Sequence, residues 1–588
     1  MGTVSITVQP TAGMPAWRLV VIAIVGLLAV GIGVAAGSFL LTTRAATVGS
    51  GAAYVPADAP FYVEMRLEPS AAQDGAVREL LGRFPPIEGV NLDRPLYAQL
   101  VARADEMLAE QGAGVSWADD VAPWFDGRVA FAVTELPASA MEMPIDPTAV
   151  PETPTVVVLV GVTDAIAAEA GIERLVAEAG EMAPSFIETE HAGVTIRSVE
   201  GSEVGAYALA ADQLVIGSDV DAVKVALDTH AAGSGALAEM AEITRLTDAL
   251  PADWLTFATY DMTGVVADVL ADGVAASPEL AAALKSLIEH QPLRGAMAVS
   301  ASGDRVLLDA ATDPPTGPFA IENAERGLAA EVPADALYYS EAGNLGTAFA
   351  AVIEPIKQAL RSTPEGEGLI GTAEAALGAD LEQLVSWIGD GAIAIGYDGT
   401  QPYGGMVLVP NDMAAAERRL GQLASFAGLG ALDPTSGITV SEEEVDGVAV
   451  TSIRWEDTNA APASMFPTPT SLVVEYAVTD NRALIGFGDS FVRRVLALDE
   501  ADALASQPRY ADAIAELGGS ESAGVIWLDL AGTREAVETA LGPMLEAADP
   551  DGAYELKIRP WLMPLDRIVS VMRLEGDVLI QRAALLVE

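Results

Sequence analysis

The chain contains no cysteine and very little histidine. The missing cysteine excludes disulfides, thiolate metal sites, cysteine nucleophiles and a lipidated cysteine anchor. Histidine occurs only as His191, His230 and His290, none of which has a histidine or acidic neighbour at metal-ligand spacing. A zinc site would need at least two of them to converge, and no HExxH motif is present. We therefore expect no metal site.

Positive charge is also scarce. Lysine occurs only at positions 224, 285, 357 and 557, and 31 basic residues face 84 acidic ones, which gives a net charge of −53. A surface this acidic repels phosphate backbones, so nucleic acid is excluded as a partner. It favours solubility and could hold divalent cations loosely. Adaptation to high salt and GC-rich coding both account for this composition.

Motifs for catalysis are missing as well. There is no Walker A or Rossmann glycine pattern, and the segment 519–524, "GSESAG", departs from the G-x-S-x-G of a serine nucleophile. The segment 549–555, "DPDGAYE", fills too few positions for a calcium loop and is read as a turn. Acidic pairs are too common in this chain to indicate a site. We predict no catalytic, cofactor-binding or metal-binding residue, no cofactor, and a protein that is not an enzyme.

One stretch predicts a membrane anchor. Residues 19–41 carry no charge, and about 20 helical residues cross a bilayer core. Trp17 precedes the run at an interfacial position, and Arg18 and Arg44 bracket it. A cleaved signal peptide is the alternative, with "VAAGS" as its cleavage region. We expect a short tail (1–18), an uncleaved anchor (19–41), a tether (42–53), and a single-pass protein of the cell membrane with an extracytoplasmic body.

An unusual phrase occurs twice. "YVPADAPFYVEM" at 54–65 returns as "EVPADALYYSEA" at 331–342, and six later blocks recur in the same order, among them "WFDGRVAFAV" and "WIGDGAIAIG". Ordered recurrence over the chain predicts two tandem units, 54–318 and 331–588, with a joint at 319–330. Proline and aspartate in the phrase predict a turn that launches the first strand of each unit, so we assign Asp58 and Asp335 a structural role.

Hydrophobic periodicity changes within each unit. The segments 61–67 and 128–136 are typical of strands, and 193–219 predicts three short strands in succession. Helical spacing occurs at 77–84, 97–108 and 172–179, and again at 381–388. Runs of strands separated by helices predict an α+β fold: two tandem similar units of antiparallel sheet with helices packed on it, after one transmembrane helix. Two proline-rich stretches, 137–154 and 459–470, predict surface loops.

The apolar N-terminal segment, the "YVPADAPFYVEM" opening and the repeated blocks together resemble the bacterial family catalogued as domain of unknown function 3352. The resemblance covers roughly 54–588 and implies no catalytic residue. We interpret the chain as a non-enzymatic binding or scaffold protein whose partners are the lipid bilayer, through 19–41, and other cell-envelope proteins or the cell wall. Two alternatives stay open: a divalent-cation or cell-wall binder, and a carboxylate-dependent hydrolase with its site between the repeats.

Overall fold

The computed structural model describes residues 49–588 apart from eleven short gaps or single positions, and the N-terminal 48 residues are not described. The gaps are 111–113, 138–152, 179–184, 201–204, 277–281, 283–284, 362–363, 434–435, 457–470, 489 and 549–551. The predicted tail (1–18), the predicted anchor (19–41) and most of the predicted tether lie outside the described residues. So do nearly all residues of both proline-rich stretches.

The predicted membrane anchoring needs correction. Among the described residues, no helix has both the length and the apolar content to cross a bilayer. This finding goes against a single-pass protein of the cell membrane. The prediction depended on 19–41 alone, which is not among the described residues, and hydropathy counts apolar side chains without showing where a segment packs.

The predicted fold class is also corrected. Twenty strands belong to one large antiparallel sheet, accompanied by helices, where we predicted two units of antiparallel sheet after a transmembrane helix. Periodicity identifies strands but not their partners. One example is β10 (Arg305–Thr312), which falls within the predicted first unit but pairs along its length with β22 (Val578–Val587) near the end of the chain.

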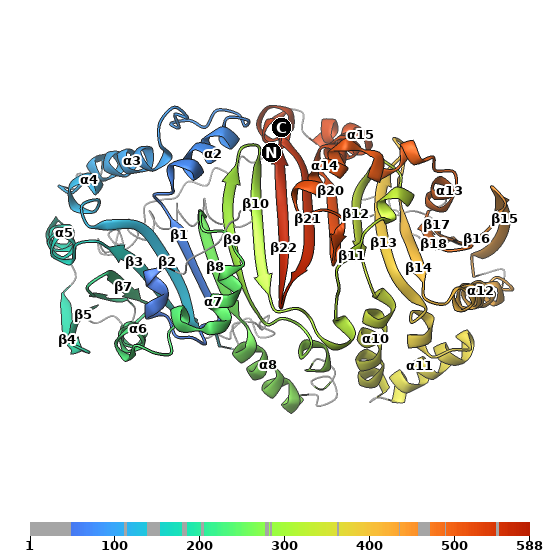
Figure 1. Ribbon diagram of the computed structural model, residues 1–588, viewed down its shortest axis with the longest axis horizontal. Coiled ribbons are helices and arrows are strands. Elements are labelled where there is room, and N and C mark those ends of the chain that lie inside the picture. The colour runs from blue at the N-terminus through green and yellow to red at the C-terminus, as the bar shows by residue number, and fades with distance from the viewer. Residues whose placement is uncertain are drawn as a thin grey trace. The chain divides into compact units, whose positions relative to one another are not determined.

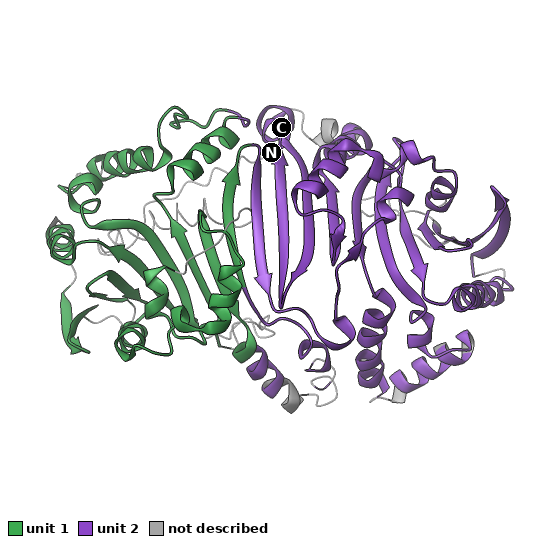
Figure 2. Ribbon diagram, viewed as in Figure 1, with its two compact units in different colours: residues 1–82, 86–265, 296–303 green, residues 83–85, 266–295, 304–588 purple. Residues whose placement is uncertain are grey.

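The described chain divides into two compact units (Figure 2). Unit 1 comprises residues up to 82, 86–265 and 296–303, and unit 2 comprises 83–85, 266–295 and 304–588. Hydrogen-bonded strands of unit 1 follow the order β4, β5, β6, β7, β3, β2, β1, β8 (Figure 1). Those of unit 2 follow the order β10, β22, β21, β20, β12, β13, β14, β18, β17, β16, β15.

The strands of unit 1 are β1 (Phe61–Arg66), β2 (Phe125–Glu135), β3 (Thr155–Val162), β4 (Phe186–His191), β5 (Val194–Val199), β6 (Ala206–Leu209), β7 (Gln213–Gly217), β8 (Thr256–Asp261) and most of β9 (Arg294–Ser302). Its helices are η1 (Ser50–Tyr54), α2 (Ala71–Leu81), α3 (Leu96–Glu110), α4 (Trp117–Asp120), α5 (Ala165–Glu178), α6 (Val220–Ala232), η4 (Leu237–Glu239) and α7 (Ala241–Asp248). Helix α8 (Thr263–Ala276) spans the boundary in sequence between the two units.

The remaining strands of unit 2 are β11 (Ala324–Glu325), β12 (Ala336–Ala342), β13 (Ile388–Tyr397), β14 (Pro402–Pro410), β15 (Ile438–Val445), β16 (Val448–Glu456), β17 (Ser471–Val478), β18 (Ala483–Phe487), β19 (Glu521–Ser522), β20 (Gly524–Asp529) and β21 (Leu565–Glu575). Its helices are η5 (Gly317–Phe319), η6 (Leu328–Glu331), α10 (Leu345–Arg361), α11 (Pro364–Leu377), η7 (Leu381–Leu384), α12 (Met413–Gly430), α13 (Phe491–Leu496), η8 (Glu500–Asp502), η9 (Leu504–Ser506), α14 (Pro508–Glu516), α15 (Leu530–Ala548), η10 (Tyr554–Ile558) and α16 (Arg559–Leu562).

The repeated phrase builds the same turn in each unit. In unit 1, Pro56 bridges to Ala236 just before β1. In unit 2, Pro333 bridges to Ala503 just before β12. The strand that follows then lies between two equivalent neighbours: β1 pairs with β2 and β8, and β12 pairs with β13 and β20. A proline lacks the N–H that a central strand needs, which is why it stands before the strand.

Local sequence explains many element boundaries. Helix α12 begins where the Asp412 side chain accepts the Ala415 N–H (2.9 Å), a typical helix N-cap. The three strands predicted within 193–219 are confirmed as β5, β6 and β7, and the helical spacing at 97–108 lies in α3. The helix predicted at 381–388 is wrong, because only the short η7 forms there and Ile388 begins β13.

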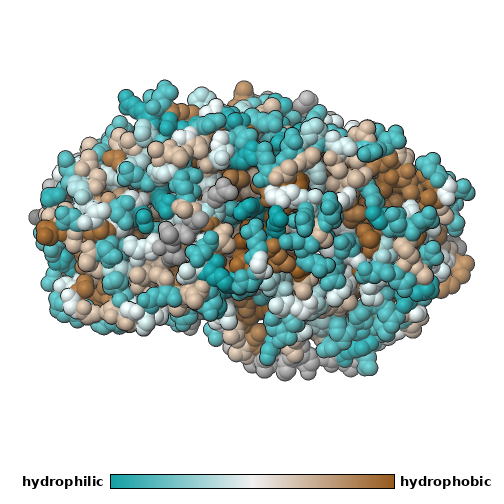
Figure 3. All heavy atoms as spheres, in the orientation of Figure 1, coloured by the Kyte–Doolittle hydropathy of each residue, from teal (hydrophilic) through white to brown (hydrophobic). Residues whose placement is uncertain are grey.

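Each unit has its own apolar core. In unit 1 one cluster surrounds Trp117 and Trp124, and in unit 2 the largest cluster contains Tyr339, Phe491 and Trp527. The face of the molecule seen in Figure 3 is mainly hydrophilic, with separate apolar areas, as the charge composition suggests. Burying these aromatic side chains is the main stabilising contribution to each unit.

Candidate functional site

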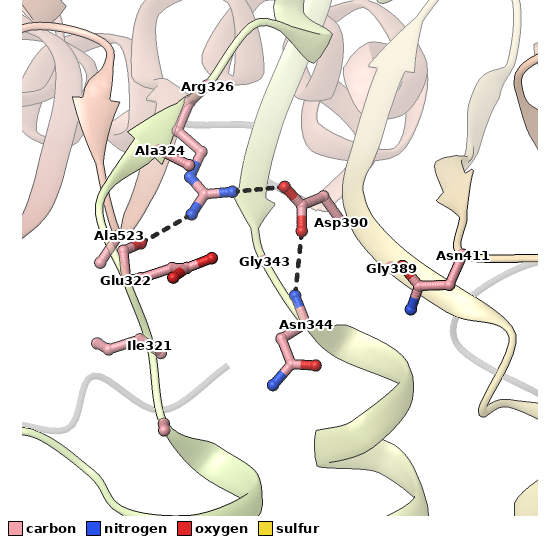
Figure 4. Close-up of a pocket in the computed structure, with 11 residues that line it drawn as sticks. Ile321, Glu322, Ala324, Arg326, Gly343, Asn344, Gly389, Asp390, Asn411 and Ala523 are labelled. Carbon is pink, nitrogen blue, oxygen red and sulfur yellow. Dashed lines mark hydrogen bonds and ion pairs between the residues drawn. The ribbon is translucent and has the colours of Figure 1, made fainter.

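A cavity of about 400 Å³ in unit 2 is the best candidate site among the described residues. Its volume falls within the usual range for small-molecule pockets. The lining residues come from the segment before η6, the turn between β12 and α10, the start of β13 and the residue after β14: Ala320, Ile321, Glu322, Ala324, Arg326, Gly343, Asn344, Gly389, Asp390, Asn411 and Ala523 (Figure 4).

Arg326 forms a buried wall of this cavity. Its side chain is only 2% exposed. The guanidinium donates to the carbonyl of Ser522 through Nε (2.9 Å) and to the carbonyl of Glu322 through Nη2 (3.2 Å). Its Nη1 donates to Asp390 (3.1 Å). A buried charge needs such partners, and here a carboxylate and two carbonyls supply them.

Asp390 connects Arg326 to the start of α10. Its Oδ2 accepts from Arg326, and its Oδ1 accepts the backbone N–H of Asn344 (3.2 Å). Asn344 has a positive φ of 57°, a conformation that asparagine tolerates better than most residues. A glycine at position 343 suits this turn, because a Cβ there would crowd Arg326 Nη2 and Asp390 Oδ1 at 3.1 Å from each. The turn is therefore shaped to fit the ion pair.

Glu341 fixes the chain that carries Arg326. Its carboxylate, in β12, accepts the backbone N–H groups of Gly327 and Leu328 (3.1 Å each) and the hydroxyl of Tyr339. The residue is 3% exposed, and burial raises the pKa of Glu341 above its usual value, while the hydrogen bond from Tyr339 offsets part of that rise. Because Gly327 directly follows Arg326, these bonds hold the arginine in place.

Glu322 is the second acidic residue in the lining of the cavity, beside Asp390. It is exposed, and its carboxylate makes no hydrogen bond or ion pair with any residue that the structure describes. Figure 4 shows this carboxylate pointing into the space between Arg326 and Asn344. Asn411 lies on the opposite side, where its Nδ2 donates to the carbonyl of Ile388 (3.2 Å). The cavity thus offers oxygen acceptors to a bound molecule.

A second, wider depression of about 490 Å³ also lies in unit 2. It is lined by Arg83, Phe84, Pro85, Glu555, Arg559, Pro560, Met563, Pro564 and Glu588. Its basic groups already have partners: Arg559 donates to Glu538 (2.8 Å) and Arg83 donates to the carbonyl of Val587 (2.6 Å). The ring of Phe84 stacks near that of Trp561, 6.2 Å between centroids. These contacts are those of a packed surface.

The three histidines have separate partners. His191 lies 2.7 Å from Asp228, His230 stacks on the ring of Tyr54 at 4.0 Å, and His290 lies 3.1 Å from the hydroxyl of Thr316. Within the described part of the chain, no group of three histidine or acidic side chains is placed to hold a metal ion. Of the weak calcium-loop pattern at 549–555, residues 549–551 lie outside that part.

The two aspartates of the repeated phrase differ in their contacts. Asp335 accepts a hydrogen bond from the hydroxyl of Tyr403 and pairs with Arg494. Asp58 is exposed and forms no side-chain hydrogen bond or ion pair with the described residues. Neither residue lines the cavity.

Sequence reasoning missed the cavity. Asp390 stands in the block "WIGDGAIAIG", which we used only as evidence of a repeat, and Arg326 stands in the predicted joint 319–330. A lone arginine in a chain with 31 basic residues gives no signal. The run G-D-G before an apolar strand was the one available hint, because glycines flanking an acid indicate close backbone packing around it.

No curated protein matches this chain. Solved structures that match include "Structure of crystal form I of TP0453" at 7% identity and "Structure of crystal form III of TP0453" at 12% identity. The first match covers 45% of this chain and 79% of the other at a TM-score of 0.20, and the second covers 44% and 93% at 0.19. At these scores the likeness supports no inference about fold or function.

A family model matches residues 19–553 and thus most of the chain. Its description is "Protein of unknown function (DUF3352)". The match includes the repeated phrase in both places and the entire lining of the cavity. The family named in the sequence resemblance is thereby confirmed, and the chain belongs to the DUF3352 family of proteins of unknown function.

Proposed function

We propose that this protein is a non-enzymatic binding protein and that the cavity around Arg326 and Asp390 is its ligand site. The observation that carries the proposal is the arrangement of the cavity wall. Arg326, Asp390 and Asn344 are fixed by mutual hydrogen bonds, while the Glu322 carboxylate points into the space without a partner among the described residues. Ligand sites are usually largely preformed, and a few fixed polar groups orient the bound molecule.

The chemistry of the lining supports binding over catalysis. No histidine, serine, threonine, tyrosine or cysteine is among the lining residues. Carboxylates can also act as general acids, general bases or nucleophiles, so Glu322 and Asp390 are the lining groups that could take part in catalysis. Asp390 is engaged on both oxygens, by Arg326 and by Asn344. Binding to a cell-envelope protein or to the cell wall stays a prediction.

Blocking the cavity tests the proposal. Ala320 is exposed and lines the cavity, so Ala320→Trp should fill it without disturbing the core. Ala330→Trp is the matched control, because Ala330 is also exposed and lies outside the lining. In ligand-observed saturation-transfer NMR with a panel of small polar fragments, we expect several signals that Ala320→Trp abolishes and Ala330→Trp preserves. Fragment signals that survive Ala320→Trp, or no signals at all, would overturn the proposal.

A further inference from the structure

The charged groups of the cavity differ greatly in accessibility. The positive group, Arg326, has a side chain that is 2% exposed, and three of its five N–H donors are already used within the protein. The side chain of Asp390 is 45% exposed, and Glu322 is exposed. A bound molecule therefore meets carboxylate oxygens and not the guanidinium.

The balance of charge in the cavity is negative. Asp390 and Arg326 compensate each other as an ion pair, and Glu322 adds a further negative charge that no described residue neutralises. Asn344 and Asn411 add amide groups on the other side. A molecule that enters the volume of about 400 Å³ and displaces water from this carboxylate binds best if it carries a positive charge and several N–H donors.

We propose that the cavity binds a small organic cation that carries a primary ammonium or guanidinium group, with Glu322 as its counter-ion. This inference rests on the proposed function and adds the chemical class of the ligand. The cation donates to Glu322 and to the remaining lone pairs of Asp390, and its carbon skeleton contacts Ile321 and Ala320. The net charge of −53 attracts such a ligand and repels anions at long range.

Three probes of similar size, one cationic, one neutral and one anionic, test the class of ligand. The probes are n-butylamine, n-butanol and butyrate, compared by saturation-transfer NMR at fixed ionic strength and neutral pH. We expect a signal for n-butylamine that exceeds that of n-butanol by at least about threefold, and none for butyrate. Raising the salt concentration should weaken the n-butylamine signal, because salt screens charges at exposed positions.

A pair of matched variants assigns the counter-ion. Glu322→Gln removes the unpartnered carboxylate without breaking an internal contact, so it should fold as the native chain does and lose at least about fivefold in affinity for n-butylamine. Glu325→Gln removes an exposed carboxylate three residues further along the chain and outside the lining, where the nearest hydrogen bond comes from Ser520 (3.4 Å). It should bind n-butylamine normally.

The outcomes separate this inference from the proposed function. If n-butanol or butyrate binds as well as n-butylamine and Ala320→Trp abolishes that binding, the cavity is a ligand site but the cation class is wrong. If n-butylamine binds and Glu322→Gln has no effect, the assigned counter-ion is wrong. If no fragment of any charge responds to Ala320→Trp, both proposals fail.

Discussion

The first strand of each unit contains the same buried group in different surroundings. Glu64 in β1 and Glu341 in β12 are 2% and 3% exposed, and each accepts the hydroxyl of the tyrosine two residues before it. Each also accepts backbone N–H groups from the start of a short helix, one from Gly49 in unit 1 and two, from Gly327 and Leu328, in unit 2. Both carboxylates therefore attach the preceding chain to the sheet.

The surroundings differ two residues further along each strand. In unit 1, Arg66 of β1 pairs in register with Arg128 of β2, and the Arg66 guanidinium lies 3.8 Å from the centre of the Trp254 ring. In unit 2, Gly343 stands two residues after Glu341, and Asp390 precedes Gly391, the partner of Ala342. Two long side chains thus occupy a place that unit 2 leaves to a glycine and an acid.

This difference gives unit 2 the polar wall of its cavity. The missing side chain at Gly343 leaves room for the pair of Arg326 and Asp390, which lines the cavity. The shared framework of tyrosine, glutamate and helix start makes a stable unit in either case. What distinguishes these two places is a small number of charged residues at equivalent positions, where a scaffold can gain a site without changing its core.

Removing the two buried carboxylates should give the largest effect. Glu341→Ala leaves two N–H groups and the Tyr339 hydroxyl without their acceptor, and Glu64→Ala leaves one N–H group and the Tyr62 hydroxyl. At about 1–3 kcal/mol for each unsatisfied group, we expect unit 2 to lose about 3–9 kcal/mol and unit 1 about 2–6. Urea unfolding, monitored by hydrogen exchange in each unit, measures the free energy of unfolding that each variant loses. An equal or larger loss for Glu64→Ala would contradict the comparison.

The repeated phrase should give an intermediate effect that differs between its two copies. Asp335→Ala removes the acceptor of the buried Tyr403 hydroxyl and the partner of Arg494, so we expect a loss of about 1–2 kcal/mol. Asp58→Ala removes no side-chain contact with the described residues and should change stability by less than about 0.5 kcal/mol. Thermal unfolding of the two variants beside the native chain compares them. Equal losses of stability in the two variants would show that the aspartate stabilises the turn itself and that its side-chain contacts contribute little.

The dependence of stability on pH should be the smallest effect and should be shared by the two units. Burial raises the pKa of Glu64 and of Glu341 above 4.5, so the folded protein binds protons more tightly than the unfolded chain does. The stability that this contributes is fully present below pH 4.5 and is lost as pH rises through the folded pKa.

Glutamine variants isolate that contribution. The unfolding free energy of the native chain minus that of Glu341→Gln should fall as pH rises from 4.5, and the same should hold for Glu64→Gln. A difference that rises with pH would show that the buried carboxylates are stabilised in their charged form.

Parts of this architecture could be predicted from the sequence. The phrase with Pro56 and Pro333 predicted a turn before a strand, and the alternation within 193–219 predicted three strands, because both signals are local. The helix predicted at 381–388 failed, since four apolar residues at helical spacing cannot distinguish a helical face from a short turn that leads into a buried strand. The prediction of the sheet's extent failed for a different reason, because β10 pairs with β22, which lies more than 250 residues away in the sequence.

By itself, the sequence determined the family, the local turns and strands, and the strongly acidic composition. Only the tertiary structure decided that the strands join one sheet, and that Arg326, Asp390 and Glu322 meet around a cavity. The physical reason is the distance along the sequence over which each effect acts. Turn chemistry and periodicity act over a few residues, whereas a pocket depends on which strands pair and on which side chains that pairing leaves room for.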